Sequence, residues 1–263
     1  MSVVGDRARR DLDRAAYVTA LGDDALIAAQ RMGEWIATAP QIEEDVALGN
    51  IALDLLGQAR SLLSYAGALL DPVRTEDELA YFRDEREFRN VQLVERGWGR
   101  ERRDFGVAMA RLLILSTYQH ALYSALASST DETVAAIAAK AVKEVDYHRD
   151  HATMWVIRLG DGTADSHLRV QAALDEEWRY VDELFEGSWV APALVESGVA
   201  ADPARLRATF DRRAAAVLAE ATLTVPEVTP AVTGGRRGVH TQEMGYLLAE
   251  MQHLARSHPG ATW

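Results

Sequence analysis

Three polar residues share one face of a helix that the sequence predicts near the middle of the chain, and together they could ligate a metal ion. Glu144, His148 and His151 follow the spacing i, i+4 and i+7, which places them on one side of an α-helix. Tyr147, however, stands three residues after Glu144, where the Glu-x-x-His motif of di-iron proteins has histidine. We therefore interpret the cluster as a buried polar network, with a single weak metal site as the alternative.

A di-iron site between four helices needs a carboxylate from each helix and a histidine from two of them. Leu55 and Gln58 lie at the middle of the second long helix, where Glu and His would be needed, and neither can replace an iron ligand. The third long helix has no Asp or Glu between Asp104 and Asp131. The sequence thus predicts a degenerate chamber of largely apolar and neutral amide groups, with no metal ligand set, at Gln30, Leu55, Gln58, Glu144, Tyr147 and His148.

Other catalytic motifs are absent from the sequence. It contains no Gly-x-Ser-x-Gly elbow, no phosphate-binding loop, no dinucleotide-binding glycine pattern and no His-Glu-x-x-His. We therefore predict no catalytic residue. Arg236 and Arg237, in a glycine-rich loop at residues 233–238, could contact an anion such as a coenzyme A phosphate. A glycine turn with solvated arginines is the interpretation we favour there.

Helices must position these residues, and the seven prolines lie where the apolar periodicity breaks. We expect four long helices, a further helical stretch and two more helices, over residues 14–38, 42–69, 104–128, 131–159, 165–186, 203–223 and 241–256. Capping boxes at Thr75-x-x-Glu78 and Ser129-x-x-Glu132 mark two helix starts. The fold class is all-α, a ferritin-like four-helix bundle with additional C-terminal helices, in a single domain over 1–263 whose residues 1–13 form a disordered N-terminus.

Composition excludes several classes of partner. The chain has 28 Lys and Arg against 40 Asp and Glu, a net charge of -12 that repels nucleic acid and anionic membranes. There is no cysteine, which removes disulfides and thiolate metal sites. The first residues do not resemble a secretory signal, and no window is apolar enough to span a membrane. We expect a cytoplasmic protein that binds neither nucleic acid nor membrane.

Long stretches of the sequence resemble one family, the C subunit of bacterial phenylacetyl-coenzyme A 1,2-epoxidase. The resemblance covers nearly the whole chain. The stretches that carry it are DDALIAAQRMGEW (23–35), DVALGNIALDLLGQARSLLSYA (45–66), LAYFRDEREFRNVQLVE (79–95), KAVKEVDYHRDHATMWVIRLGDGT (140–163) and ATLTVPEVTPAVTGGRRGVHTQEMGYLLAEMQ (221–252).

The resemblance implies a ferritin-like structural subunit without a cofactor of its own. Its partner would be a homologous catalytic A subunit that carries the di-iron site and the acyl-coenzyme A pocket, accompanied by other epoxidase subunits and a reductase. Such a complex converts the aromatic ring of phenylacetyl-coenzyme A to an epoxide with dioxygen and NADPH. Where the catalytic paralogue has Glu-Ala-Gly-His, this chain has Leu-Leu-Gly-Gln at residues 55–58.

Two alternatives remain open at this point. The first is a stand-alone ferritin-like metal-dependent oxidase with an atypical site made of Glu34, Glu144, His148 and His151. The second is a free acyl-coenzyme A carrier that uses Arg236 and Arg237. Stable iron in the purified chain would favour the oxidase, and heat released on titration with coenzyme A would favour the carrier.

Overall fold

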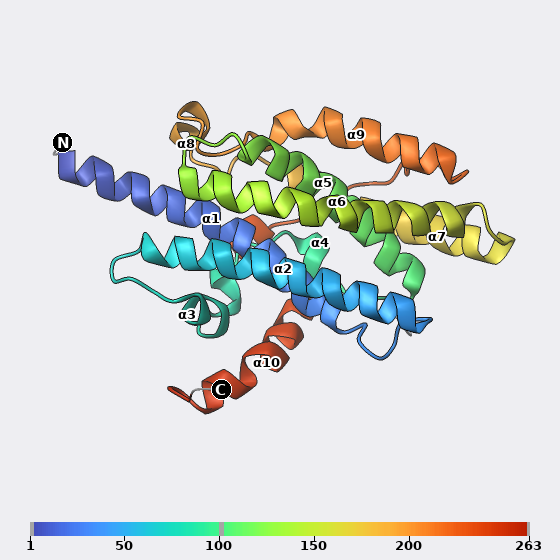
Figure 1. Cartoon of the computed structure of the whole chain (residues 1–263), viewed down its shortest axis with the longest axis horizontal. Coiled ribbons are helices and arrows are strands. Elements are labelled where there is room, and N and C mark those ends of the chain that lie inside the picture. The colour runs from blue at the N-terminus through green and yellow to red at the C-terminus, as the bar shows by residue number, and fades with distance from the viewer. Residues whose placement is uncertain (1–2, 100–102, 262–263) are drawn as a thin grey trace. The chain divides into compact units, whose positions relative to one another are not determined.

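The computed structural model of the chain describes residues 3–99 and 103–261, which contain ten α-helices and no β-strand (Figure 1). The predicted all-α class is therefore confirmed. The chain divides into two compact units. The first comprises Met1–Arg96, Trp189–Ala200 and Gly234–Trp263, and the second comprises Gly97–Ser188 and Ala201–Thr233. The prediction of a single domain remains a prediction.

The first unit is built on an antiparallel hairpin of two long helices, α1 (Val3–Gly33) and α2 (Ile42–Ala68), which pack along each other. Buried residues of α2 recur every three or four positions, as expected for one face of a helix: Leu48, Ile51, Leu55, Ala59, Leu62 and Ala66. Shorter helices complete the unit: α3 (Glu76–Tyr81), α4 (Gln92–Glu95), α8 (Pro192–Glu196) and α10 (Gln242–Ser257).

The start of α1 corrects one prediction. We expected residues 1–13 to be disordered and the first helix to begin near Arg14, but α1 begins at Val3. No proline precedes Pro40, and residues 8–16 include alanine, arginine and leucine, which favour helices. A helix nucleated further along therefore extends towards the N-terminus at little cost. Residues 1–2 lie outside the described residues.

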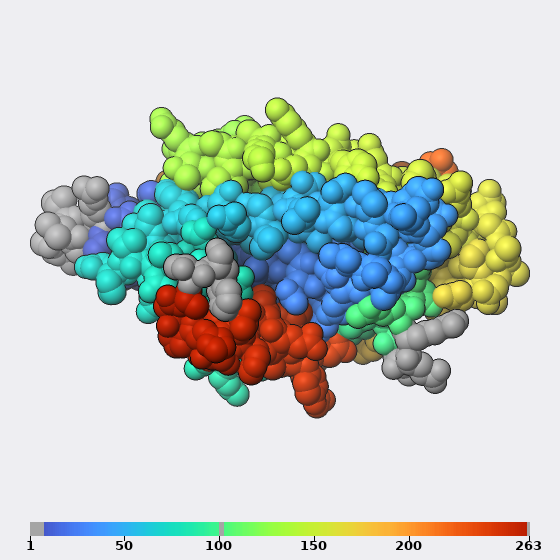
Figure 2. Space-filling model, turned by 60° about the horizontal axis from the view of Figure 1, so that its bottom comes forward, coloured from blue at the N-terminus to red at the C-terminus, as the bar shows by residue number. Residues whose placement is uncertain are grey.

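The outer side of α2 is uncovered and partly apolar. Ile42, Val46 and Leu53 are 76%, 58% and 66% exposed, and their spacing places them on one side of the helix. This side of α2 is visible in light blue in Figure 2. Large exposed aliphatic side chains in a row are characteristic of surfaces that contact another protein.

The second unit surrounds one buried helix, α5 (Phe105–Leu126). It packs against α6 (Glu132–Gly160), α7 (Ala164–Trp178) and α9 (Pro203–Glu220). Most of its residues are buried, and it contains no Asp or Glu, as expected for a helix covered on all sides. Neither α5 nor any other described helix is long and apolar enough to cross a membrane.

Two predicted helix starts are confirmed. The Thr75 hydroxyl accepts from the Glu78 N–H at 3.1 Å, and the Glu78 carboxylate accepts from the Thr75 N–H at 2.7 Å, so the capping box of α3 is complete. Asp202 caps α9 through the N–H of Ala204, with Pro203 at the first helical position.

The predicted capping box at Ser129 is wrong. Helix α6 begins further along the chain, with Asp131 as its N-cap. The Asp131 carboxylate accepts from the N–H groups of Thr133 and Val134, each at 3.0 Å, whereas the Ser129 hydroxyl accepts from the N–H of Asp131. A charged carboxylate is a stronger acceptor for the helix N-terminus than a hydroxyl, which explains the choice. The predicted stretch 165–186 is also divided, because α7 ends at Trp178 and a separate 3-10 turn follows at Asp182–Phe185.

Candidate functional site

The chamber positions on the first hairpin do not fit a di-iron site. Leu55 is fully buried and its side chain has no donor atom, and Gln58 is buried with a neutral amide in place of an imidazole. Gln30 on α1 is half-buried. Glu34, a ligand in the alternative oxidase, forms an ion pair with Arg31 at 2.6 Å.

The chamber positions on α6 are divided between its buried and exposed sides. His148 and His151 are buried, while Tyr147 is 49% exposed and its ring lies 6.0 Å from that of His151. Glu144 is partly buried, and its carboxylate pairs with Lys140 at 2.7 Å. Over residues 3–99 and 103–261, no three His, Asp or Glu side chains are grouped so that they could hold a metal ion. The degenerate chamber as a whole remains a prediction.

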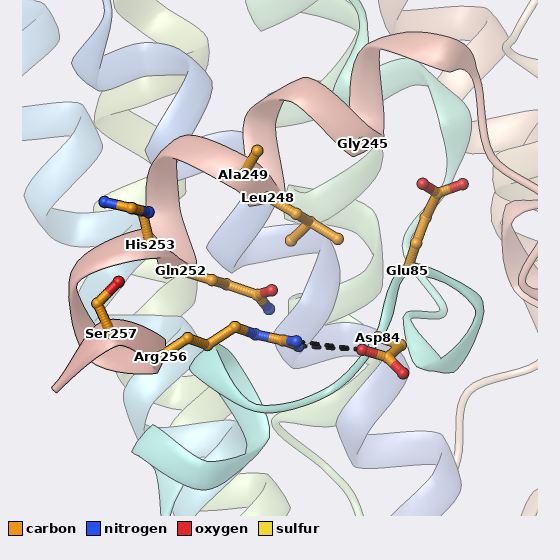
Figure 3. A pocket seen from close by; sticks show the side chains of 9 residues that line it. All are labelled: Asp84, Glu85, Gly245, Leu248, Ala249, Gln252, His253, Arg256 and Ser257. Carbon is orange, nitrogen blue, oxygen red and sulfur yellow. Dashed lines mark hydrogen bonds and ion pairs between the residues drawn. The ribbon is translucent and has the colours of Figure 1, made fainter. Parts of the chain in front are cut away.

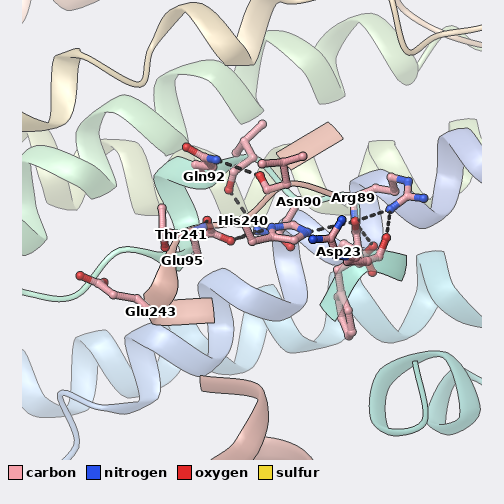
Figure 4. A network of polar contacts seen from close by, with 12 residues as sticks. Asp23, Arg89, Asn90, Gln92, Glu95, His240, Thr241 and Glu243 are labelled. Atoms are coloured by element: carbon pink, nitrogen blue, oxygen red, sulfur yellow. Dashed lines mark hydrogen bonds and ion pairs between the residues drawn. The ribbon is translucent and has the colours of Figure 1, made fainter. Parts of the chain in front are cut away.

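The most extensive polar arrangement of the first unit is a buried network that joins α1 to loops distant in sequence (Figure 4). Two adjacent aspartates in the middle of α1 anchor it. The Asp23 carboxylate pairs with both terminal nitrogens of Arg83 and accepts from the N–H of Arg89 at 2.9 Å. Asp24 accepts from the N–H of Val91 at 2.8 Å. The segment after α3 is thereby held against the helix.

Arg236 belongs to this network, and the anion contact predicted for it is wrong. Its guanidinium donates to both oxygens of Asp24, at 3.1 and 2.7 Å, and its side chain is only 1% exposed. It also stacks over the ring of Trp189 at 4.4 Å. An internal carboxylate, which the sequence did not reveal, therefore neutralises this cation. Arg237 is exposed, and an anion contact there remains a prediction.

A third ion pair of the network joins Glu95 at the end of α4 to His240. The Nδ1 atom of His240 lies 2.8 Å from the Glu95 carboxylate, and Nε2 lies 3.2 Å from the carbonyl of Phe88. Both neighbours are acceptors, an arrangement that favours the doubly protonated, cationic imidazole. Glu95 also accepts from the N–H of Thr241 at 2.6 Å, which fixes the start of α10.

The pKa values of His240 and Asp24 in this network are both shifted. Burial tends to lower the pKa of His240, but the hydrogen bond and charge of Glu95 outweigh it, and the pKa is raised. Burial raises the pKa of Asp24, and the charge of Arg236 and the Val91 N–H oppose that rise. The network can therefore fix segments of the chain in place, but its carboxylates are already engaged and are poorly suited to acid–base chemistry.

Sequence reasoning missed this network although one signal was available. Asp23 and Asp24 interrupt an apolar helical run, between Leu21 and Ala25. Acids at core-facing positions of a long helix require buried cations, because an unpaired charge cannot remain in the interior. The two arginines that pair with them are 60 and 212 residues away, and one sequence does not give those pairings.

A pocket of about 430 Å³ lies between α10 and the turn at Asp84 and Glu85 (Figure 3). Two polar side chains that line this pocket form contacts with other residues of the first unit. Arg256 pairs with Asp84 at 3.2 Å, and the Gln252 amide donates to the carbonyls of Ala80 and Arg83 at 3.0 Å each. These contacts attach α10 to the preceding segment and assign no chemistry to the pocket.

Comparison with known proteins gives two matches along nearly the whole chain. The model of a family described as phenylacetic acid catabolic protein matches residues 5–263. The C subunit of the 1,2-phenylacetyl-CoA epoxidase of Escherichia coli (strain K12) is 45% identical over 248 residues, which cover 94% of this chain and 98% of that protein. The family match therefore includes both units and the loop at residues 233–238.

Proposed function

Because the chain belongs to the phenylacetic acid catabolic protein family, we propose that it is the C-type subunit of a phenylacetyl-coenzyme A epoxidase and supports catalysis by another subunit. In this role it takes part in phenylacetate breakdown without holding the reacting groups. The non-catalytic role is supported by the lack of metal-ligating side chains at the expected positions of α2 and α5. Leu55 and Gln58 replace the expected ligands, and α5 contains no carboxylate.

The partners follow from the same proposal. A homologous A subunit would hold the di-iron cofactor and the acyl-coenzyme A pocket, and other epoxidase subunits and a reductase would complete the system in the cytoplasm. The uncovered apolar side of α2 supports association with another protein, because Ile42, Val46 and Leu53 would be removed from water on binding. A non-catalytic subunit also has a physical role to play, because rigid packing around a metal site supports its ligands.

The stand-alone oxidase is not favoured. Two of the four ligands it requires, Glu34 and Glu144, are engaged by Arg31 and Lys140. The free acyl-coenzyme A carrier loses one of its two cations, because Arg236 is buried and paired with Asp24. The similarity to an epoxidase subunit also favours the multicomponent role over both.

Iron content and activity test the proposal. We expect the purified chain, after incubation with ferrous iron and removal of loose metal, to retain essentially no iron and to consume no dioxygen. When it is combined with the catalytic subunit, we expect a stable complex with epoxidase activity. Retention of about two irons per chain, as in ferritin-like di-iron proteins, would refute the non-catalytic role.

A pair of variants separates a ligand role from a supporting one. In the reconstituted complex, Glu34→Gln and Glu144→Gln should leave epoxidation within about twofold of wild type, because each carboxylate is engaged by a cation three or four residues earlier in the chain and the glutamine amide keeps its shape and its acceptor oxygen. Loss of activity in either variant, with the complex still assembled, would point to a metal-binding role for that carboxylate.

A further inference from the structure

A pocket of about 420 Å³ in the first unit has an apolar wall and four arginines. It is distinct from the pocket in Figure 3. The apolar part includes Leu12, Ala16, Leu70 and Leu79 with the ring of Trp189. The arginines are Arg74, Arg83, Arg89 and Arg236, and Glu87 is the one acidic residue among the lining side chains. The volume is within the range of pockets that bind small molecules.

The four arginines differ in how their charges are balanced. Arg83 is paired with the buried Asp23, and Arg236 is paired with the buried Asp24. Arg89 donates to the backbone carbonyls of Arg86 and Phe88, each at 2.7 Å, and its guanidinium pairs with no carboxylate of the described residues.

Arg74 and Glu87 complete the charges around the pocket. The guanidinium of Arg74 makes no hydrogen bond or ion pair with the residues that the structure describes; its charge acts only at longer range on Glu78. Glu87 is partly used already, because it accepts from the N–H of Asp84 at 2.8 Å. Among the lining residues four arginines face one glutamate, and the buried Asp23 and Asp24 balance only Arg83 and Arg236, in a chain whose net charge is -12.

The backbone around both uncompensated arginines is closely fixed. A Cβ atom at Gly67 would lie 2.0 Å from the carbonyl oxygen of Arg74, so only glycine lets the turn after α2 close on the helix end. Gly238 has a φ of 74°, and a Cβ atom there would lie 2.7 Å from a guanidinium nitrogen of Arg89. Gly67 thus lets the backbone at Arg74 pack against the end of α2, and Gly238 leaves room for the guanidinium of Arg89.

We propose that this pocket binds a small organic anion that carries a carboxylate or phosphate beside an apolar group. Arg74 and Arg89 would contact the charge, since guanidinium groups bind both kinds of anion through parallel hydrogen bonds. The aliphatic residues and Trp189 would cover the apolar group. The proposal does not depend on the epoxidase role.

Calorimetric titration of the full chain tests this site. Phenylacetate and phenyl phosphate are the probes, because each joins a ring to an anionic group and the two distinguish carboxylate from phosphate. Benzyl alcohol supplies the ring without charge, and inorganic phosphate supplies charge without a ring. We expect saturable binding of at least one ring-bearing anion and much weaker binding of both controls.

Three arginine variants locate the binding. Arg74→Gln and Arg89→Gln should each raise the Kd about tenfold, the effect of losing one charge-assisted contact. Arg86→Gln removes the same charge from an exposed side chain outside the pocket and should leave the Kd unchanged. The guanidinium of Arg74 makes no contact that the fold needs, so its variant remains interpretable if Arg89→Gln is unstable.

Several results would overturn the proposal. Absence of heat with both ring-bearing anions would do so, as would equal affinity for benzyl alcohol or for inorganic phosphate. Binding that is as strong in Arg74→Gln and Arg89→Gln as in the wild type would place the ligand elsewhere. None of these results bears on whether the chain assembles with a catalytic subunit, which co-purification measures separately.

Discussion

Replacement of Arg236 by methionine should strongly destabilise the first unit. The guanidinium donates to both oxygens of Asp24 and to the carbonyls of Ala20 and Arg89, at 3.2 and 2.8 Å. Methionine retains much of the apolar volume but leaves a carboxylate with 6% exposure without its cation. Removing one partner of a buried ion pair costs about 3–5 kcal/mol of the free energy of unfolding.

Urea unfolding followed by circular dichroism measures this loss. Arg237→Met is the matched control, because the neighbouring side chain is exposed and its loss should cost less than about 1 kcal/mol. The double variant Asp24→Asn with Arg236→Met should recover part of the loss, because no buried charge remains. The penalty of Arg236→Met should also shrink at low pH, where a buried, isolated Asp24 takes up a proton.

A loss in free energy of unfolding for Arg236→Met no larger than that for Arg237→Met would contradict this prediction. A double variant less stable than the single one would contradict it too, because the cost would then lie in lost packing on Trp189 and not in the buried charge.

Further predictions concern pH and two glycines. The pairing with Glu95 raises the pKa of His240 in the folded chain. The pair therefore stabilises the fold fully below the unfolded pKa near 6.5, and this stabilisation is lost as the pH rises through the folded pKa. Urea midpoints from pH 6 to 9 should fall in the wild type and fall less in His240→Gln. Gly238→Ala should cost more than about 1 kcal/mol, because φ is 74° and its Cβ would lie 2.3 Å from the Arg86 carbonyl oxygen. Gly49→Ala, in open space on α2, should instead stabilise by about 0.5–1 kcal/mol in the same unfolding assay, and the opposite sign for either glycine would contradict these assignments.

Proline positions and apolar periodicity predicted most of the helices, because both depend on local chemistry. The ends of α2, α5 and α10 differ from prediction by only one or two residues. The N-terminal extension of α1 was missed because residues 6–13, just before Arg14, are mostly charged. They show no apolar periodicity of the kind that marks a helix packed on a core. The capping box at Ser129 was predicted because a hydroxyl followed three residues later by a glutamate fits that pattern, whereas the structure uses the Asp131 carboxylate.

The candidate site was predictable only where it depends on residue type. Leu55 and Gln58 exclude a complete ligand set whatever the fold does, and the sequence sufficed for that. The role of Arg236 depends on Asp24, 212 residues away, and glycine-flanked arginines in a loop look solvated until that partner is known. The pocket with Arg74 and Arg89 likewise combines segments that no local pattern connects.

The separation between Asp24 and Arg236 also sets the order in which the molecule can be completed during its synthesis. The first unit contains the first 96 residues, but its last segment begins at Gly234. At roughly 5–20 residues per second, a ribosome needs about 10–40 s to reach Arg236 after it has made Asp24. During that time the hairpin of α1 and α2 contains Asp23 and Asp24, which are buried in the finished fold, but Arg236, the partner of Asp24, has not yet been made. The second unit, all of which is made in the meantime, can therefore begin to fold before the first is finished.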